Sequence, residues 1–386
     1  MIGISKLYCG TTETADNIRY HHGAKSHLER KPVVVWNCTR SCNLTCAHCY
    51  SASDSACGEY EMTTEEGRML IDQLADFGSP VILFSGGEPL LRKDVPELAQ
   101  YAVRKGMHAV ISTNGTLIDT QTAELLKASQ LTYVGVSIDG LEDTHDRFRR
   151  RNGAFLEALW GIRACREAGL KVGLRCTLNH ENVHEIPEIF ELMVREKIPR
   201  ICFYHLVNTG RGKNIENSML SHEATRQVID TIIDYTARLY AQGHKMEVLT
   251  VDNLADGPYL YLRMLQEKHP GAATVLNLLK RTAGGSTGVG IGCVNWNGDV
   301  YPDQFWRDKK LGNVLERPFG DIWTDLSNPL MKKLKDKKTY VKGRCSDCRL
   351  LDICSGNFRA RAEALTGDAW AADSGCYLSD EEIGLI

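Results

Sequence analysis

Strand-like and helix-like segments alternate along the first two thirds of the chain. Short apolar runs predict strands at 33–36, 81–84, 108–112, 133–138, 172–178 and 200–205. Amphipathic patterns between them predict helices at 64–77, 95–105, 120–128, 155–168, 185–196 and 222–239. Such alternation indicates βαβ units and a parallel sheet. We therefore expect an α/β fold, a partial (β/α)6 TIM-like barrel, with its active site at the carboxyl ends of the strands.

The pattern changes at both ends of the chain and divides it into four regions. Residues 1–30 are polar and predict an N-terminal extension outside the sheet, followed by the barrel-like core at 31–245. Residues 246–292 have a mixed, glycine-containing pattern and predict a connecting region. From 293 to 386, short strands, turns and clustered cysteines predict a smaller C-terminal domain.

Composition narrows the class of protein. The chain has 386 residues, of which 43% are hydrophobic and 25% charged, as in ordinary globular proteins. Its net charge of −3 gives no reason to expect nucleic acid or an anionic membrane as a partner. The N-terminus lacks the pattern of a signal peptide. Because no such pattern is seen, the 14 cysteines indicate a reducing, cytoplasmic compartment and metal binding rather than disulfides.

Cys42, Cys46 and Cys49 lie on a short loop after the first predicted strand, with the spacing C-x3-C-x2-C. Thiolates are the usual ligands of iron–sulfur clusters. Three thiolates on a four-iron cluster would leave one iron free for a small molecule, and open coordination is typical of catalytic metal sites. The alternative is a zinc knuckle, although zinc sites usually add a second cysteine pair or histidines.

Polar or glycine-rich motifs follow the next three predicted strands, at the same expected edge. Their candidate residues are Gly86, Gly87 and Glu88 after the second strand, Ser112 and Asn114 after the third, and Ser137 after the fourth. Glycines let the backbone approach a ligand, and a glutamate can accept a hydrogen bond from an ammonium group. The small polar side chains could bind hydroxyl or carboxylate groups, but each motif alone could also be an ordinary turn.

Arginines are also expected near this edge. Arg175 interrupts the apolar strand at 172–178, where its guanidinium could face a carboxylate or form a buried ion pair. A basic run follows the fourth strand, and a further arginine follows the sixth. The candidates for binding an acidic substrate are Arg147, Arg149, Arg150 and Arg211. A solvated charged surface is the alternative interpretation of this run.

A second group of cysteines lies near the C-terminus. Its members are Cys345, Cys348, Cys354 and Cys376. Four thiolates can complete a four-iron cluster, and a fully ligated cluster suits electron transfer. A structural zinc site with four cysteines is the alternative.

With these motifs assembled, the chain resembles the radical S-adenosylmethionine (radical SAM) superfamily over nearly its whole length. C-x3-C-x2-C is the cluster motif of that family, with His48 where an aromatic ring is more usual. The resemblance implies that the cysteine loop holds a [4Fe–4S] cluster whose open iron binds the amino and carboxylate groups of S-adenosylmethionine. It implies further contacts to this cofactor from Gly86, Gly87, Glu88, Ser112, Asn114, Ser137 and Arg175.

The C-terminal region resembles a SPASM domain, the auxiliary-cluster module of the superfamily. Asp303 and Phe358 stand where full modules carry cysteines. The resemblance therefore implies one auxiliary [4Fe–4S] cluster on the four C-terminal cysteines, with Cys293 left over from a second. The expected cofactors are two [4Fe–4S] clusters and S-adenosylmethionine.

The segments KPVVVWN, TYVGVSIDG, HDRFR, GVGIGC and LGNVLERPFGDIW resemble the tetrapyrrole-modifying branch of this superfamily. The resemblance implies an enzyme of alternative haem biosynthesis that removes two acetate arms from 12,18-didecarboxysiroheme, giving iron-coproporphyrin III, with an external electron donor. A haem d1 enzyme acting on propionates, a peptide-modifying enzyme and a non-catalytic electron carrier are the alternatives. His21, His22 and His27 could ligate the substrate iron or be ordinary surface histidines.

Overall fold

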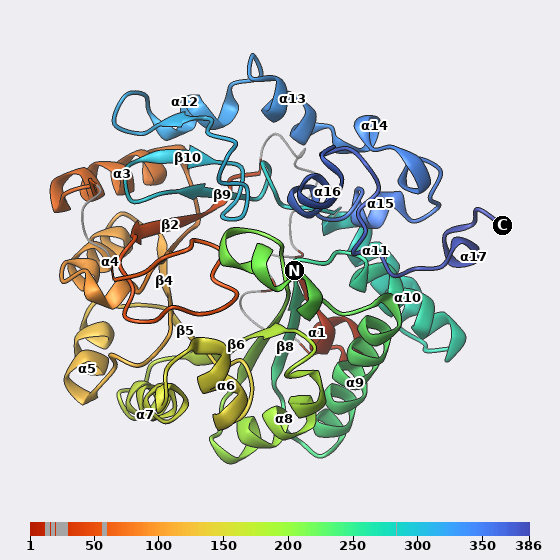
Figure 1. Cartoon of the computed structure of the whole chain (residues 1–386), viewed down its shortest axis with the longest axis horizontal. Helices are drawn as coiled ribbons and strands as arrows, with labels where there is room; N and C mark the ends of the chain where they lie inside the picture. The colour runs from red at the N-terminus through yellow and green to blue at the C-terminus, as the bar shows by residue number, and fades with distance from the viewer. Residues whose placement is uncertain (12–15, 17–19, 21–29, 56–59, 283) are drawn as a thin grey trace.

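The computed structural model describes residues 1–11, 16, 20, 30–55, 60–282 and 284–386. Figure 1 shows a curved sheet with helices packed on its outer side. The strand order is β1-β8-β7-β6-β5-β4-β3-β2-β9-β10-β11, and β2 to β8 run parallel. The predicted α/β fold with a parallel, barrel-like sheet is therefore confirmed.

The six predicted strands all form, and several extend further than the apolar runs indicated. The parallel strands are β2 (Val33–Thr39), β3 (Val81–Gly86), β4 (His108–Thr113), β5 (Tyr133–Ser137), β6 (Val172–Leu178), β7 (Arg200–His205) and β8 (Glu247–Val251). The helices on the outer side are α3 (Thr64–Phe77), α4 (Val95–Arg104), α5 (Thr120–Ala128), α6 (Glu142–Arg149), α7 (Ala154–Glu167), α8 (Ile186–Arg195) and α9 (His222–Ala241).

Local sequence explains where these elements begin and what they bury. Thr63 and Glu66 form a reciprocal capping box at the start of α3, which satisfies backbone N–H groups of the first turn. Trp36 of β2 and Phe84 of β3 are fully buried, with ring centroids 5.6 Å apart. Burying one such side chain contributes roughly 1.5–3 kcal/mol. The core therefore lies between the sheet and its helices, which leaves the strand ends free for chemistry.

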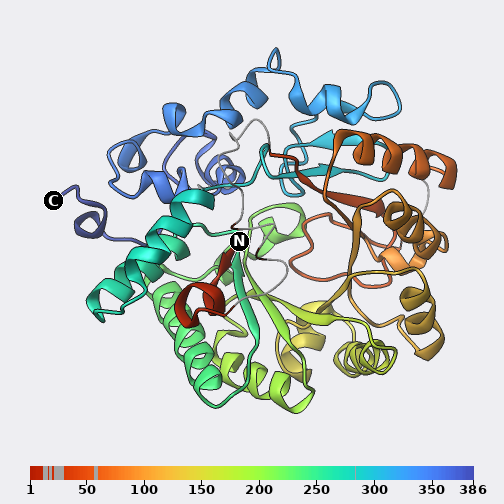
Figure 2. The same cartoon turned by 180° about the vertical axis from the view of Figure 1, so that it is seen from behind.

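The boundaries expected at both ends of the core differ from those observed. β1 (Ile2–Gly3) pairs with β8, so the first residues are part of the sheet and not outside it. β8 itself pairs in parallel with β7, although it falls in the region expected to be only a connection. Seen from behind in Figure 2, α1 (Ile4–Cys9) lies beside this edge. The three N-terminal histidines lie outside the described residues.

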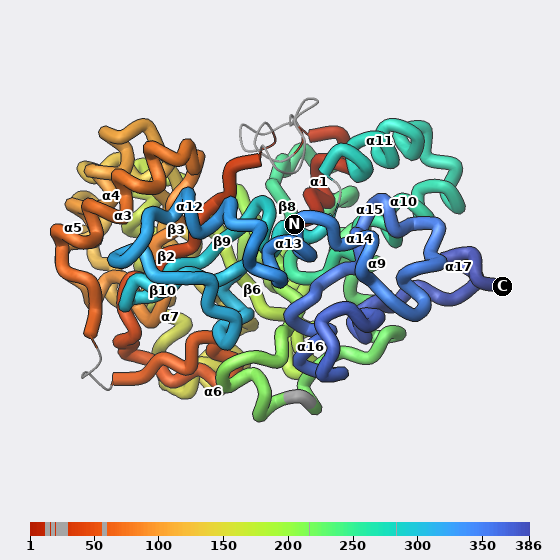
Figure 3. The backbone as a smooth tube through the Cα atoms, turned by 90° about the horizontal axis from the view of Figure 1, so that it is seen from above, coloured from red at the N-terminus to blue at the C-terminus, as the bar shows by residue number. Residues whose placement is uncertain are grey.

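The C-terminal region continues the same sheet and then turns into short helices. β9 (Ile291–Val294) pairs in parallel with β2, and β10 (Asp299–Tyr301) and β11 (Gly312–Asn313) extend it in antiparallel fashion. The remaining helices are α10 (Asp256–Gln266), α11 (Ala272–Thr282), α12 (Phe319–Thr324), α13 (Pro329–Lys335), α14 (Lys337–Tyr340), α15 (Leu351–Cys354), α16 (Arg359–Thr366) and α17 (Asp380–Ile383). Figure 3 shows α15 beside α10 and α11, against which it packs.

Candidate active site

A cavity lies at the carboxyl ends of the parallel strands, where sequence reasoning placed the site. Most of the predicted cofactor-site residues line it together, although they come from five strands and the loops that follow them. They are Cys42, Cys46, Cys49, Gly86, Gly87, Ser112, Asn114, Ser137 and Arg175. Parallel strands bring their carboxyl ends to one edge, which is why motifs far apart in sequence meet here.

Two glycines allow the loop after β3 to lie directly against the cysteine loop. A Cβ atom on Gly86 would lie 2.4 Å from the carbonyl oxygen of Thr39, and one on Gly87 would lie 2.0 Å from that of Ser41. The backbone N–H of Gly87 donates to the Thr39 oxygen at 2.8 Å. Any side chain would force these two loops apart, so glycine is required for close backbone approach at both positions.

Each sulfur of the cysteine loop has a polar neighbour. The backbone N–H of Leu44 donates to Cys42 Sγ at 3.4 Å, and Cys49 Sγ lies 3.3 Å from Ser51 Oγ. Arg149 Nη1 donates to Cys46 Sγ at 3.6 Å. Such donors suit thiolates, and hydrogen bonds to sulfur are one of the means by which proteins tune iron–sulfur clusters.

Burial alone keeps the thiols of Cys42 and Cys46 protonated. It raises the pKa of Cys42 to about 12 and also raises that of Cys46. The positive charge of a metal centre reverses this preference, because a coordinating thiol is deprotonated outright. The donor set therefore fits a metal cluster.

Within the described ranges, no three His, Cys, Asp or Glu side chains converge as closely as one metal ion requires. The ligands of a [4Fe–4S] cluster are held further apart, because each binds a different iron at a corner of the cubane. Three cysteines that line one cavity are the donor set that the motif predicts for such a cluster.

A buried ion pair supports the cysteine loop from behind. Arg149 pairs with Asp139, and both side chains are almost completely buried. Although burial alone would raise the pKa of Asp139, Arg149 holds it below its usual range. The ring of His48 stacks on Phe148 with centroids 4.4 Å apart, and burial lowers the pKa of His48 to about 4. At neutral pH His48 is therefore an uncharged, stacked ring at the position where an aromatic residue was expected.

Glu88 follows β3 and lies against the cysteine loop, where its backbone N–H donates to the Ser41 oxygen at 2.8 Å. Its side chain is fully buried, and its carboxylate accepts hydrogen bonds from Thr113 Oγ1 at 2.7 Å and from the backbone N–H of Asn114 at 2.8 Å. It also accepts from the backbone N–H of Leu90 at 3.1 Å. These three hydrogen bonds join the loop after β3 to the end of β4, and contact between Glu88 and an ammonium group remains a prediction.

The four arginines expected to face an acidic substrate have different positions. Arg211 donates to the carbonyl oxygens of Cys46 at 2.8 Å and Ser53 at 2.7 Å, so it fastens the cysteine loop. Arg149 also supports the cysteine loop, through its hydrogen bond to Cys46 Sγ and its ion pair with Asp139. Arg147 and Arg150 are exposed at the end of α6, and Arg147 pairs with Glu181. The structure thus does not bring the four together as one binding patch.

The cavity also contains residues that the sequence reasoning missed. They include Tyr50, Tyr204, His205, Asp252, Gln304 and Phe305. The guanidinium of Arg175 lies 4.5 Å from the ring centroid of Tyr204. Tyr204 and His205 end the sixth predicted strand, so they could have been predicted as cavity residues from their position at a strand end. Asp252 follows β8, which was not predicted, and no motif marked it.

The second group of cysteines lies outside this cavity. Burial, with the nearby thiols of Cys345, Cys348 and Cys376, raises the pKa of Cys354 to about 12, which indicates that the four lie close together. The two positions expected to lack a cysteine have other roles. Asp303 accepts hydrogen bonds from Thr287, Phe305 and Trp306, and Phe358 packs edge-on against Phe305. Cys293 is buried within β9.

A curved parallel sheet whose rim carries a three-cysteine loop beside a Gly-Gly-Glu loop is the arrangement of radical SAM enzymes. In agreement, residues 36–193 match the radical SAM superfamily, and residues 290–349 match the SPASM iron–sulfur cluster-binding domain. The chain belongs to the radical SAM superfamily and carries a SPASM domain. It is therefore an enzyme that uses S-adenosylmethionine and [4Fe–4S] clusters.

Two relatives are similar to this chain along most of its length. Fe-coproporphyrin III synthase of Methanosarcina barkeri is 57% identical, covering 100% of this chain and 99% of that protein. Pre-heme d1 synthase of Dinoroseobacter shibae is 38% identical, covering 92% and 88%. Among solved structures, native anSMEcpe with bound AdoMet has a TM-score of 0.70 at 18% identity, covering 91% of this chain and 96% of that one. That structural likeness concerns the fold alone.

No helix among the residues that the structure describes is long and apolar enough to cross a membrane.

Proposed function

We propose that this protein removes the two acetate arms of 12,18-didecarboxysiroheme and so forms iron-coproporphyrin III in an alternative haem pathway. The observation that carries the proposal is the 57% identity with Fe-coproporphyrin III synthase along the full length of both chains. The 38% identity with pre-heme d1 synthase supports a tetrapyrrole substrate at a greater distance.

In this proposal the two groups of cysteines hold one [4Fe–4S] cluster each. Cys42, Cys46 and Cys49 hold the cluster that binds S-adenosylmethionine, since they line the cavity and each sulfur has a polar neighbour. The ligands of the auxiliary cluster are Cys345, Cys348, Cys354 and Cys376. Asp303 and Phe358 stand where full SPASM modules carry cysteines, and this supports a single auxiliary cluster.

The bound cofactors supply a carbon-centred radical and electrons, whereas the chain orients the groups that react. Ser112, Asn114, Ser137 and the backbone of Gly86 and Gly87 line the cavity wall, where they would hold S-adenosylmethionine. Glu88 acts indirectly, because it fixes the loop that presents these backbone groups.

The substrate is a polyanion, and cationic groups are available at the cavity and its rim. Arg175 lies in the wall, where a carboxylate of the macrocycle can meet its guanidinium. Arg147 and Arg150, exposed at the end of α6, extend this charge to the outer rim. The described cysteines are all free thiols, which supports a reducing, cytoplasmic location. The electrons for the reaction would come from an external donor.

The test is an anaerobic reaction of the reconstituted protein with S-adenosylmethionine, a reductant and didecarboxysiroheme, followed by mass spectrometry. We expect 5′-deoxyadenosine and a macrocycle lacking both acetate arms. Loss of propionates would instead place the protein with haem d1 enzymes. Cleavage of S-adenosylmethionine with an unchanged macrocycle would overturn the tetrapyrrole proposal. Cys42→Ala is the control that abolishes both products.

A further inference from the structure

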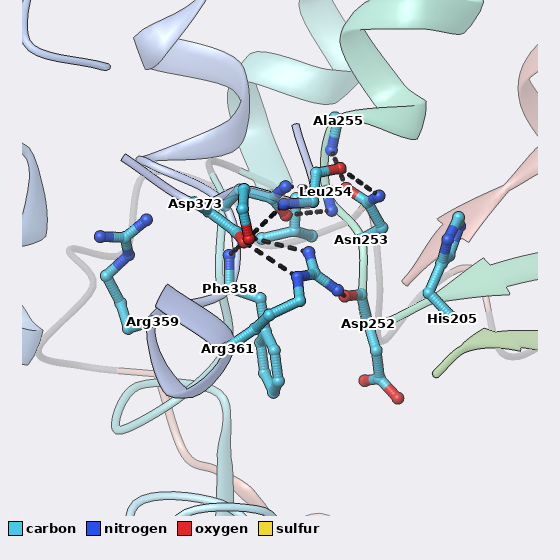
Figure 4. Close-up of polar contacts among 12 residues, drawn as sticks. His205, Asp252, Asn253, Leu254, Ala255, Phe358, Arg359, Arg361 and Asp373 are labelled. Atoms are coloured by element: carbon cyan, nitrogen blue, oxygen red, sulfur yellow. Dashed lines mark hydrogen bonds and ion pairs between the residues drawn. The ribbon is translucent and has the colours of Figure 1, made fainter. Parts of the chain in front are cut away.

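Asp252 is a cavity-lining carboxyl group that no cofactor role explains. It follows β8 directly and lines the cavity beside Tyr204 and His205. Within the described part of the chain, its buried Oδ2 atom has no hydrogen-bond partner. Figure 4 shows this carboxylate turned away from the hydrogen-bonded network formed by Arg361 and Asp373. A buried acceptor without a partner is costly, so it calls for a functional explanation.

The backbone at Asp252 is held in an unusual conformation. Its φ of 67° lies in the left-handed region, which few residues other than glycine adopt and in which aspartate and asparagine are the most common exceptions. Arg361 Nη1 donates to the carbonyl oxygen of Asp252 at 2.9 Å, and the Leu254 N–H donates to Asn357 Oδ1 at 2.6 Å. Contacts on both sides of Asp252 thus fix this turn and with it the position of the side chain at the cavity.

Several charged groups face this carboxyl. Asp303 opposes its ionisation, whereas Arg361, His205 and the N-terminal amino group favour it. Burial outweighs these influences and raises the pKa of Asp252 from its ordinary value of 3.8 to about 7. Near neutral pH a substantial fraction of the molecules therefore carries a proton on this side chain. A neutral acid is also the form that tolerates an anionic substrate nearby.

The proposed reaction needs such a proton. Removal of a hydrogen atom from the carbon adjacent to the ring carbon that bears the acetate arm allows the bond between that ring carbon and the arm to break. One electron of the broken bond completes a new ring double bond, and the other leaves with the carboxymethyl radical. To become acetate, this fragment needs one electron and one proton.

We propose that Asp252 donates this proton to the departing carboxymethyl group, with the electron supplied by a reduced iron–sulfur cluster. The proposal rests on the proposed function. After each arm has left, the carboxylate of Asp252 regains a proton from solvent. Both acetate arms require the step, so Asp252 must act twice for each macrocycle.

The contacts around Asp252 place the proton source on the side of the auxiliary cysteines. Arg361 joins the Asp252 carbonyl to Asp373 through two hydrogen bonds of 2.7 and 2.9 Å. The backbone carbonyl of Asp373 accepts from the N–H of Cys376, one of the proposed ligands of the auxiliary cluster. The proton and the electron would thus reach the fragment from the same region of the protein.

The first experiment follows the origin of the new hydrogen in acetate. The reconstituted enzyme converts didecarboxysiroheme in D2O, and mass spectrometry counts deuterium in the released acetate. One deuterium per acetate is expected, because a carboxyl group exchanges with solvent. Acetate without deuterium would overturn the proposal, since its hydrogen would then come from a carbon-bound source. Absence of acetate from the wild-type reaction would instead overturn the proposed function, and this proposal with it.

The second experiment compares Asp252→Asn with Asp252→Glu and with the surface control Asp234→Asn. Asp252→Asn should still form 5′-deoxyadenosine, while acetate release falls roughly 100-fold, the usual contribution of a general acid. Wild-type acetate release should decline above about pH 7, as the acid loses its proton. Asp252→Glu should recover part of the rate and keep a pH dependence. If Asp252→Asn released acetate as fast as the wild type, the proposal would be overturned.

A third measurement tests the raised pKa of Asp252 through protein stability, without any catalytic reaction. The raised pKa means that the folded protein resists ionisation of Asp252, while the unfolded chain ionises near its ordinary value of 3.8. Wild-type stability should therefore fall relative to Asp252→Asn as pH rises from about 4 through about 7, and then level off. Anaerobic melting curves of both proteins at several pH values give this difference. A difference that does not change with pH would overturn the assignment.

Discussion

The two groups of cysteines are each braced by a buried arginine–aspartate pair, but the two pairs have different neighbours. At the cavity, Arg149 pairs with Asp139 and also donates to the sulfur of Cys46 at 3.6 Å. This pair is thus in contact with a proposed cluster ligand itself. It lies close enough to influence the charge that the cluster carries.

In the C-terminal region, Arg361 pairs with Asp373 and reaches the Asp252 carbonyl at 2.9 Å. No hydrogen bond to a sulfur is found for Arg361 among the described residues, whereas Asp373 accepts from the N–H groups of Phe358 and Gly375. The comparison shows that one type of ion pair serves two purposes. The first pair contacts a proposed cluster ligand as well as the backbone N–H of Thr177, and the second fixes the position of backbone segments.

The largest expected difference between the two regions comes from removing a cysteine in each. Cys42→Ala should abolish cleavage of S-adenosylmethionine, because three thiolates are the minimum that holds the cluster in an open state. Cys354→Ala should lose about half of the iron, keep formation of 5′-deoxyadenosine and lose product. Iron analysis and product chromatography on both variants measure this. Equal loss of 5′-deoxyadenosine in both would show that the two regions do not have separate roles.

The next effect concerns stability. Asp139→Ala and Asp373→Ala each leave a buried arginine without its partner, which costs about 3–5 kcal/mol. The loss should be larger for Asp373, which accepts hydrogen bonds from two backbone N–H groups, whereas Asp139 accepts from that of Thr177. Anaerobic denaturation of the apoproteins measures it. Asp234→Ala removes an exposed partner of Arg263 and should cost less than about 1 kcal/mol. A similar cost for all three would contradict the importance of burial.

These contrasts also show what sequence can and cannot predict. The parallel strands were predictable because continuous apolar runs lie between helical patterns, as at Val172–Leu178, whose bounds agree with the prediction. The cysteine loop was predictable because its spacing is local. β8 was missed because Glu247–Val251 is short and was interpreted as part of a connecting region, although Gly243 before it and Asp252 and Asn253 after it are turn residues. Asp252 was missed with it.

The roles of Glu88 and Arg149 were not predictable for a different reason. Glu88 finds its hydrogen-bond partners Thr113 and Asn114 on the neighbouring strand, and Arg149 meets a sulfur more than a hundred positions earlier in the chain. Both side chains belong to motifs that indicate ligand binding. Which groups they contact depends on how the strand ends come together, and this is fixed only by the tertiary fold.

The smallest expected effect tests the contact between Arg149 and Cys46. A charged donor to a cluster sulfur stabilises the reduced, more negative cluster, so its removal should make the reduction potential more negative. We expect this shift in Arg149→Gln for the cavity cluster. Arg361→Gln should leave that potential unchanged, because Arg361 makes no hydrogen bond to any of the cavity cysteines that the structure describes. Potentiometric titration followed by electron paramagnetic resonance measures both.

The double variant Arg149→Gln/Asp139→Asn separates the two causes of such a shift. It removes one positive and one negative charge, so the net charge near the cluster is that of the wild type. If the potential stays as negative as in Arg149→Gln, the lost hydrogen bond to Cys46 accounts for the shift. If it returns to the wild-type value, the unbalanced charge of Asp139 accounts for it, and the contact at 3.6 Å has no influence of its own. The second result would make the two ion pairs alike, both acting only as supports for the backbone.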